Sequence, residues 1–376
     1  MIVARPALER RILSSLDAAR IPVILGGCGS GRTSLLLRLA QLIGQERTLY
    51  VDMMAVATTP ERCLAAIRGA WRVPAAAPAA PVPQSPRAAF DALLSFFDEA
   101  TAKDGGPVTF LIDDVLDIRT FESFPGLRLV QRELVARLAA SPNQFVLASR
   151  FTTRTHRLLR DAPPRFEVVH APPLEASEIA AMAAHLDTGR GGSARVSPPV
   201  IAALTGGRPA YASILLSGLA QAGPVTDPLA ALASLLSPDG RMTDFCRHSY
   251  EFRLHRARGY GALKAILSVL ADTEPLNLTD IALRLHRTPG STKDYLSWLE
   301  DVDLITVQRK RYSFEDPLLR VYVRLYGRPA PPGDDDLVRE IHAYAQARLP
   351  RAVDVPPDGA PAAPRERPQP GLIEID

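Results

Sequence analysis

The chain has 376 residues, enough for two or three domains that each bury a core of their own. Hydrophobic residues make up 47% and charged residues 23% of the chain, which excludes both an intrinsically disordered and a collagen-like protein. The net charge of +3 is too small to predict an obligate polyanion partner, because nucleic-acid-binding proteins usually concentrate basic residues on one face.

The sequence has no feature of a secreted or membrane-spanning protein. No apolar run approaches the roughly 20 residues that a membrane helix needs, and the N-terminal segment lacks the apolar stretch of a secretory signal. The three cysteines, Cys28, Cys63 and Cys246, are far apart and odd in number, so they predict neither a disulfide framework nor a zinc site. We therefore expect a cytoplasmic protein without membrane contact.

Short apolar runs rich in β-branched residues alternate with longer helical patterns from residue 21 to about residue 170. This alternation is typical of a parallel sheet flanked by helices, so we predict an α/β domain over residues 1–172. An Ala- and Pro-rich stretch at 73–87 interrupts the pattern and is interpreted as a surface excursion. The five predicted strands span residues 22–25, 48–52, 108–113, 144–149 and 166–169.

Helical patterns replace the strands in the second half of the chain. Gly and Pro breaks within residues 173–240 are typical of a small helical lid. Residues 241–328 contain three short helical patterns and then two short apolar segments separated by a basic turn at 309–311, which predicts a winged-helix domain. Residues 329–376 combine an amphipathic segment at 335–348 with a Pro-rich tail that we expect to be disordered.

A glycine-rich stretch with the spacing G-x-x-x-x-G-[basic]-[Ser/Thr] follows the first predicted strand and opens a helix predicted at 33–43. This context is what a phosphate-binding P-loop requires, because glycines let backbone N–H groups surround a phosphate and the helix N-terminus favours negative charge. The alternative is a glycine-rich turn without a ligand. The predicted nucleotide-binding residues here are Gly26, Gly27, Cys28, Gly29, Ser30, Gly31, Arg32, Thr33 and Ser34.

Two residues of this stretch have specific predicted roles. Thr33 is the expected Mg²⁺ ligand through its hydroxyl group. Arg32 takes the place of the usual Lys, and its guanidinium is bulkier and planar. The substitution leaves nucleotide binding possible but puts hydrolysis in question.

An apolar strand predicted at 108–113 delivers two carboxylates, Asp113 and Asp114, at its carboxyl end. Ligands of α/β sheets bind at that edge. We predict that Asp113 helps to hold Mg²⁺ and that Asp114 orients or deprotonates the attacking water. The alternative is an acidic turn after a buried strand.

The strand predicted at 144–149 ends at Arg150, which the same reasoning places at the same edge of the sheet. A guanidinium there is able to contact the γ-phosphate of a nucleotide. An exposed arginine after a strand is as often simply solvated, so this residue alone is a weak signal.

Three motifs occur together in order: GGCGSGRTS at 26–34, FLIDDV at 110–115 and VLASR at 146–150. They resemble those of the STAND branch of AAA+ ATPases, a family of signal-transducing P-loop switches that includes archaeal-type ATPases. The segment at 173–178 looks like the start of the family's helical lid. The segment Gly206-Gly207-Arg208-Pro209-Ala210 is similar to its Gly-x-Pro motif, whose proline lies against the nucleotide.

The resemblance implies a sheet of order 5-1-4-3-2, ATP or ADP with Mg²⁺ as ligands, and a cycle that is closed with ADP and open with ATP. It also implies a sensor-1 role for Arg150 and a nucleotide contact for Pro209. The chain departs from the family at Arg32 and at residues 314–317, which stand near the place of a Met-His-Asp triplet.

The predicted winged helix bears on the choice of partner. Its helix at 291–299 leaves only Thr292, Lys293 and Ser297 outward by our interpretation, which is sparse for sequence recognition in DNA, and acidic residues lie alongside. Thr279 is the expected cap of the preceding helix. We therefore favour packing or switching, with DNA contact as the alternative.

Two functions follow from these observations. The first is an ATP-binding signalling switch with slow Mg²⁺-dependent hydrolysis, acting with a protein partner or by self-association. The alternative is a non-catalytic DNA-binding or adaptor protein with a degenerate nucleotide site. No histidine pair, Gly-x-Ser-x-Gly elbow or glycosidase-type carboxylate pair points to another enzyme class.

Overall fold

The fold is described by a computed structural model that covers most of the chain. The Ala- and Pro-rich excursion predicted at 73–87 lies mostly outside the described residues, and the Pro-rich tail lies wholly outside them. The described residues are 4–71, 83–187, 197–222, 227–255, 257, 259–328 and 330–349.

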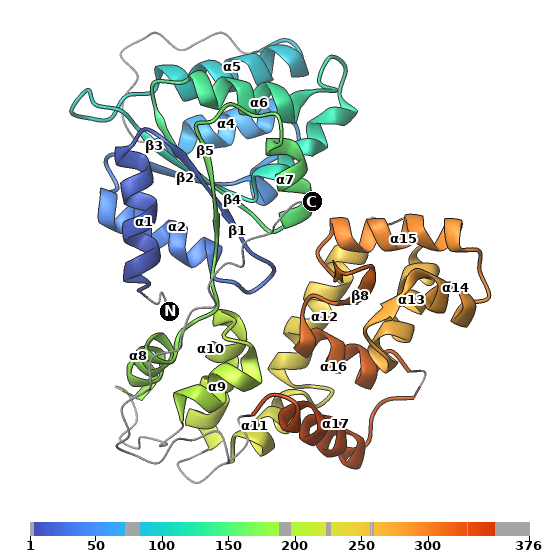
Figure 1. Ribbon diagram of the computed structural model, residues 1–376. Helices are drawn as coiled ribbons and strands as arrows, with labels where there is room; N and C mark the ends of the chain where they lie inside the picture. The colour runs from blue at the N-terminus through green and yellow to red at the C-terminus, as the bar shows by residue number, and fades with distance from the viewer. Residues whose placement is uncertain are drawn as a thin grey trace, which may run out of the picture.

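Five parallel strands form the central sheet of the N-terminal domain, in the order β2-β3-β4-β1-β5 (Figure 1). This is the expected order 5-1-4-3-2 counted from the opposite edge. All residues of β1 and β3 are buried, as in other parallel sheets that helices cover on both faces. The strands are β1 Ile21–Leu25, β2 Thr48–Asp52, β3 Thr109–Asp113, β4 Gln144–Ser149 and β5 Phe166–His170.

Helices pack on both faces of this sheet and make a three-layer α/β domain, as predicted (Figure 1). Leu36 of α2 packs with Ile24 on one face, whereas Phe97 of α5 packs with Phe110 on the other. Ser85 and Pro86 begin α5, because the serine side chain accepts from a first-turn N–H and proline suits the first helical position. The helices are α1 Pro6–Asp17, α2 Arg32–Ile43, α3 Met53–Val56, α4 Pro60–Ala70, α5 Pro86–Glu99, the 3₁₀ helix η1 Val115–Ser123, α6 Val130–Ala140 and α7 Thr152–Leu159.

The C-terminal half is mainly helical and has one continuous apolar core, which runs from Leu174 to Ala345. The helices within residues 173–240, which we predict to be a lid, and the later helices therefore share one core. In particular, α12 contributes Met242 and Cys246 to the core that α10 lines with Tyr211 and Leu215. The first helices of this half are α8 Ala176–Asp187, α9 Pro198–Thr205, α10 Pro209–Ala222, α11 Pro228–Leu235 and α12 Arg241–Leu254.

Three helices and a three-stranded sheet of order β6-β8-β7 follow α12. Strands β7 and β8 form an antiparallel hairpin, as predicted, and its two-residue turn places Arg309 and Lys310 at φ 49° and 62°. Positive φ at both positions suits the twist of a tight hairpin. These elements are α13 Tyr260–Asp272, β6 Leu276–Asn277, α14 Leu278–Arg284, α15 Pro289–Asp301, β7 Ile305–Gln308 and β8 Arg311–Phe314.

Two details of this region differ from the sequence-based expectation. Asn277 rather than Thr279 caps α14, because the Asn277 side chain accepts from the Asp280 N–H at 2.9 Å. Thr292 is buried rather than outward, and its hydroxyl donates to the Thr288 carbonyl at 3.0 Å. The outward face of α15 is therefore even poorer in groups for base recognition than predicted.

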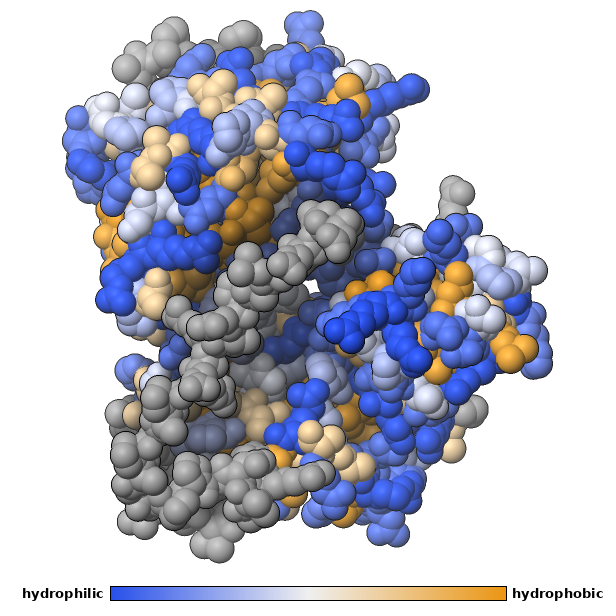
Figure 2. All heavy atoms as spheres, in the orientation of Figure 1, coloured by the Kyte–Doolittle hydropathy of each residue, from blue (hydrophilic) through white to orange (hydrophobic). Residues whose placement is uncertain are grey.

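The last two helices are α16 Pro317–Tyr326 and α17 Asp334–Gln346. The amphipathic segment predicted at 335–348 thus forms a helix, and its apolar residues Leu337 and Ile341 join the core of the C-terminal half. The Tyr344 hydroxyl donates to the Leu204 carbonyl at 2.8 Å, which ties α17 to the lid. Hydrophilic side chains cover much of the visible face (Figure 2), and no helix of the described residues is long and apolar enough to cross a membrane.

Candidate nucleotide-binding site

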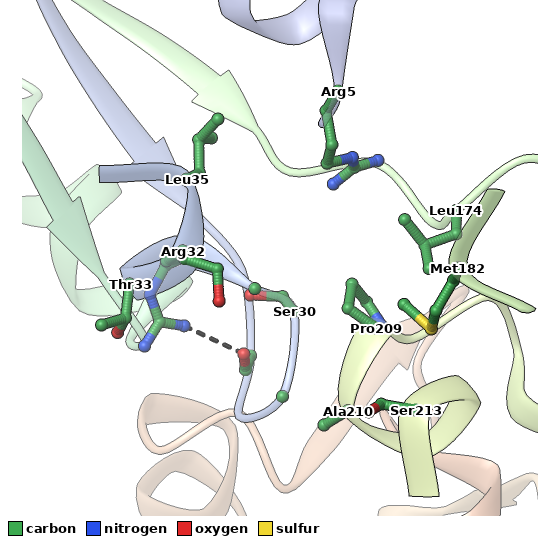
Figure 3. Close-up of a pocket in the computed structure, with 14 residues that line it drawn as sticks. Arg5, Ser30, Arg32, Thr33, Leu35, Leu174, Met182, Pro209, Ala210 and Ser213 are labelled. Carbon is green, nitrogen blue, oxygen red and sulfur yellow. Dashed lines mark hydrogen bonds between the residues drawn. The ribbon is translucent and has the colours of Figure 1, made fainter. Parts of the chain in front are cut away.

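A cavity of about 300 Å³ lies between the P-loop (residues 26–33) and the lid (Figure 3). Its walls come from three parts of the chain that are far apart in sequence: the N-terminal segment, the P-loop with the start of α2, and the lid helices. The volume is at the lower end of the range for small-molecule sites. The lining residues are Arg5, Gly27, Gly29, Ser30, Gly31, Arg32, Thr33, Ser34, Leu35, Leu174, Met182, Pro209, Ala210 and Ser213.

Glycines give the P-loop its shape. Gly29 and Gly31 have φ of 78° and 83°, in the left-handed region where a side chain is strained, and Gly31 is the N-cap of α2. The N-terminus of α2 therefore faces the cavity together with Thr33 and Ser34. Among the described residues, the buried hydroxyl of Ser30 has no hydrogen-bond partner. A ligand with acceptor atoms fits this wall, because helix N-termini offer free N–H groups and a positive dipole end.

The lid packs directly on the P-loop. The Ala210 N–H donates to the Gly29 carbonyl at 3.1 Å, and a Cβ placed on Gly29 would lie 2.9 Å from the Cβ of Ala210. Phe245 of α12 lies equally close to that position, at 3.0 Å. Pro209 faces Gly31, where an added Cβ would lie 3.2 Å from the proline ring. Pro209 therefore lies against the glycine loop, and its contact with a nucleotide stays a prediction.

Thr33 and Asp113, the two predicted metal ligands, are in direct contact. The Thr33 hydroxyl donates to the Asp113 carboxylate at 2.5 Å, and the Tyr50 hydroxyl donates to the same oxygen at 3.3 Å. Burial and the nearby Asp113 carboxylate raise the pKa of Tyr50, so its hydroxyl remains a donor. The fold thus brings together two oxygen donors from α2 and β3.

Arg32 is directed away from the lid (Figure 3). Its guanidinium donates to the carbonyls of Gly26 and Gly27, the latter at 2.9 Å, and pairs with Asp114 at 3.3 Å. The residue is only 8% exposed. Burial lowers the pKa of Arg32, an effect that Asp114 and Asp113 oppose. Arg32 lines the cavity, but its charge is engaged by a carboxylate of its own chain.

Asp114, the predicted catalytic residue, is held by two guanidinium groups. One carboxylate oxygen pairs with Arg32 at 3.3 Å and the other with Arg150 at 3.0 Å. Its backbone is left-handed, with φ of 48°. Burial raises the pKa of Asp114 although both arginines oppose the shift. Asp114 is not one of the cavity-lining residues, so in this arrangement both oxygens serve the ion pairs.

Arg150 belongs to this ion-pair cluster rather than to the cavity wall. It also pairs with Asp117 of η1, and its guanidinium lies 4.6 Å from the ring centre of Phe252 on α12. In this arrangement the Arg150 guanidinium is paired with two carboxylates and does not line the cavity, so its contact with a γ-phosphate stays a prediction. Its side chain joins the ends of β4 and β3 to α12. Cys28 is a half-buried free thiol on the P-loop outside the cavity lining.

Several lining residues were not predicted. Arg5 donates to the Pro172 carbonyl at 2.7 Å and pairs with Glu178 at 3.2 Å, which places the segment before α1 against the start of the lid. Leu174 and Met182 add an apolar wall at that end of the cavity. Only the folded chain brings these residues together, and no local motif marks them.

Comparisons with known proteins find no matching family model and no match among curated proteins. Solved structures do match. A Walker-type ATPase of Pyrococcus abyssi is 15% identical, with 86% of this chain and 96% of that chain covered and a TM-score of 0.64. The Aeropyrum pernix Orc1 protein in complex with DNA is 16% identical (86% and 92% covered, TM-score 0.45). The Thermotoga maritima RuvB Holliday junction branch migration motor is 13% identical (83% and 92% covered, TM-score 0.41). Together with the sheet order and the P-loop geometry, the Pyrococcus likeness shows that this chain has the fold of P-loop ATPases.

Proposed function

We propose that this protein is an ATP-binding switch of the STAND type that hydrolyses ATP slowly and couples the nucleotide to the lid and to the C-terminal helices. The observation that carries the proposal is the cavity between the P-loop and the lid, with Pro209 and Ala210 packed on the loop glycines. The printed description of the Pyrococcus abyssi protein as a Walker-type ATPase supports it.

The residues of the site fit a nucleotide with Mg²⁺. The P-loop N–H groups, the N-terminus of α2 and the free Ser30 hydroxyl suit phosphate oxygens, and Leu174 and Met182 suit an apolar ring system. Thr33 and Asp113 would hold Mg²⁺, which neutralises phosphate charge when bound. Two protein oxygens suffice, because Mg²⁺ usually keeps several waters and phosphate ligands. The described residues contain no cluster of three or more metal-binding side chains, so a protein-built metal cage does not compete with this interpretation.

The packing of the C-terminal half supports a switch. Lid helix α10 and helix α12 share one apolar core, and both contact Gly29 of the P-loop through Ala210 and Phe245. A change at the phosphate end of the cavity therefore acts on both helices at once. We infer that residues 241–328 form a winged-helix domain that packs and moves with the lid, and that the closed arrangement corresponds to the ADP state of the cycle.

Slow turnover is part of the proposal. Asp114 is shorter than the glutamate common at this position, and two arginines already bind its carboxylate. In other P-loop enzymes, an additional arginine supplied by a neighbouring subunit accelerates hydrolysis on the order of 10³-fold or more. Candidates on or next to α7 are Arg154, Arg157 and Arg160, of which Arg157 pairs with Asp301 of its own chain. Self-association or a separate protein partner is therefore the proposed route to faster turnover.

A second candidate function is a non-catalytic adaptor or DNA-binding protein with a degenerate site. The engagement of Arg32 by Asp114 favours it, because the cation expected at the phosphates is turned away from the lid. Restoring lysine by Arg32→Lys separates the two functions. A switch keeps or gains hydrolysis, whereas a degenerate site stays inert.

Equilibrium binding of ATP and ADP to the purified full-length chain, with and without Mg²⁺, tests the first proposal directly. We expect both nucleotides to bind and Mg²⁺ to strengthen the binding. The absence of any affinity for either nucleotide at millimolar concentration would refute it.

A further inference from the structure

Strand β5 is an edge of the central sheet and pairs with β1 along one side only (Figure 1). The Ala171 N–H donates to the Leu25 carbonyl at 2.7 Å, and bonding residues alternate along a parallel strand. Val168 and His170 therefore turn their N–H and C=O groups away from β1. Within the described part of the chain, no backbone group pairs with these outer groups.

The side of this edge that faces α7 is apolar. Phe166 and Val168 of β5 are only half-buried, and they pack against the same core as Leu158 and Leu159 of α7. Apolar side chains gather on the visible face of the N-terminal domain where Figure 1 draws β5 (Figure 2). A strand added at this edge would extend the apolar surface, because alternate side chains of neighbouring strands lie on the same face.

The side of the edge that faces α1 is cationic. Arg11 and Arg20 both pair with Glu167 of β5, at 3.1 and 3.4 Å, and the two arginine side chains are 54% and 59% exposed. Arg165 donates to backbone carbonyls, such as that of Ala19 at 2.8 Å, and pairs with no described carboxylate. One carboxylate thus serves three guanidinium groups, so an acidic strand fits this side.

The segment at 371–376 has the side-chain pattern that this edge requires. Ile373 and Ile375 alternate with Glu374 and Asp376. In an extended chain the two isoleucines point to one face and the two carboxylates to the other. The segment lies outside the described residues.

The chain between this segment and the described residues is long enough to reach β5. Residues 350–370 follow Leu349, the last described residue, and a chain of 21 residues spans up to about 70 Å when extended. A compact chain of about 350 residues has a radius of gyration of about 20 Å. The connection therefore imposes no limit on docking within one molecule.

The opposite edge of the sheet, at β2, suits this segment less well. Glu46 lies just before β2 and Asp52 is its last residue, so carboxylates lie near both ends of the strand. Lys103 pairs with Glu46, and Arg47 pairs with Asp104, which leaves no surplus of positive charge. An acidic strand gains nothing there and faces repulsion from Asp52.

We propose that residues 371–376 add a further strand to the sheet beside β5, with the isoleucines toward Phe166 and the carboxylates toward Arg11. Backbone hydrogen bonds to the outer groups of Val168 and His170 provide the affinity, and the alternation of side chains fixes the register. The added strand covers an edge that is otherwise open to pairing with another chain. No nucleotide takes part, so this proposal does not depend on the proposed function.

Hydrogen–deuterium exchange at the Val168 and His170 amides of the full chain tests the proposal. We expect Ile373→Pro to accelerate exchange at both amides about tenfold, because proline removes an N–H and does not continue a strand. The Val169 amide, which bonds to β1, should stay protected and serves as the internal reference. Val353→Pro makes a proline substitution between Leu349 and the segment and is the matched control, which should leave all three amides unchanged.

Glu374→Lys tests the contribution of charge. We expect it to accelerate exchange at Val168 about threefold at low salt, as for loss of a surface ion pair, and to have a smaller effect at high salt. Asp354→Lys makes the same charge change outside the segment and should have no effect.

A peptide of residues 371–376 added to the Ile373→Pro chain should restore the protection of Val168 and His170. Wild-type amides that exchange as fast as those of Ile373→Pro would overturn the proposal. Protection that survives in Ile373→Pro would also overturn it, because another group would then cover the edge. Protection that disappears on dilution, together with a dimer in sedimentation, would assign the strand to a second copy and overturn docking within one molecule.

Discussion

Arg32 of the P-loop and Asp114 form a largely buried ion pair, with 3.3 Å between guanidinium and carboxylate. Arg32 occupies the position whose usual lysine contacts the phosphates, and Asp114 is the residue predicted to orient the attacking water. In the proposed function, this pairing engages both the cation of the loop and the carboxylate that would orient the attacking water. Arg150 closes the arrangement from the far side of Asp114 at 3.0 Å.

Arg32→Lys should therefore raise the rate of ATP hydrolysis. Lysine is a compact point charge on a flexible stem and cannot bridge the Gly26 and Gly27 carbonyls and Asp114 together, so it frees the carboxylate. We expect an increase on the order of tenfold, which corresponds to about 1.4 kcal/mol in the barrier. Single-turnover measurements of ATP hydrolysis test this expectation. Arg38→Lys, on the same helix, is the control. Turnover that is undetectable in the variant and the wild type would favour the adaptor function.

Asp113 and Asp114 should differ in their effects although they are chemically alike. Asp113→Asn removes charge beside Thr33, so it should weaken Mg²⁺-dependent nucleotide binding about tenfold and change Mg²⁺-free binding little. Asp114→Asn should spare binding and lower single-turnover hydrolysis at least about tenfold. Titrations and quenched-flow hydrolysis on both variants decide the point. Equal, small effects would show that the acidic pair is only the polar end of a buried strand.

The sequence was sufficient to predict the N-terminal domain closely. The predicted strand at 48–52 matches β2 Thr48–Asp52, and the strand at 108–113 differs from β3 Thr109–Asp113 by one residue. Buried parallel strands are continuous apolar runs, and glycine spacing marks the loop, so both signals are local. The rule that α/β sheets bind ligands at the carboxyl ends of their strands placed Asp113 at that edge, and the structure adds its hydrogen bond with Thr33.

The pairing of the charged residues was not predictable, because each pair joins segments that are far apart in the sequence. Arg32 meets Asp114 across 82 positions of sequence, and Arg150 approaches the same carboxylate from a third segment. Arg5 lines the cavity only because α1 packs beside β1 and the chain returns at Pro172. Periodicity shows which face of an element is buried, not which of several arginines pairs with a given carboxylate.

Asp303 should make stability depend on pH. It accepts from the Thr152 N–H at 2.5 Å, and burial raises its pKa although that hydrogen bond opposes the shift. Between the ordinary aspartate pKa and the raised one, the folded chain holds a proton that the unfolded chain has lost. The contribution of Asp303 to the free energy of unfolding is thus full below the ordinary aspartate pKa, and it is lost as pH rises through the raised pKa.

Asp303→Asn should remove that dependence, because the amide oxygen still accepts from Thr152 and carries no charge. Urea unfolding from acidic to neutral pH should show the variant gaining stability relative to wild type as pH rises. The gain should be about 1.4 kcal/mol for each pH unit that separates the folded-state pKa of Asp303 from its unfolded-state pKa. Asp301→Asn, which removes the partner of the exposed Arg157, serves as the control and should not show this trend. A parallel pair of curves for Asp303→Asn and wild type would contradict the assignment.

The cavity itself can be tested by filling it from the lid side. Ser213 of α10 lines the cavity opposite the P-loop, whereas Ser217, one turn further along the same helix, is not one of its lining residues. Ser213→Tyr should lower the affinity for both ATP and ADP more than about tenfold, because an aromatic ring occupies space that the nucleotide needs. The melting temperature should change little, since the ring enters a void rather than a packed core. Ser217→Tyr makes the same chemical change outside the cavity and should leave nucleotide binding near the wild-type level. Comparable losses in both variants would mean that the tyrosine perturbs α10 itself, and unchanged binding in Ser213→Tyr would place the nucleotide elsewhere on the molecule.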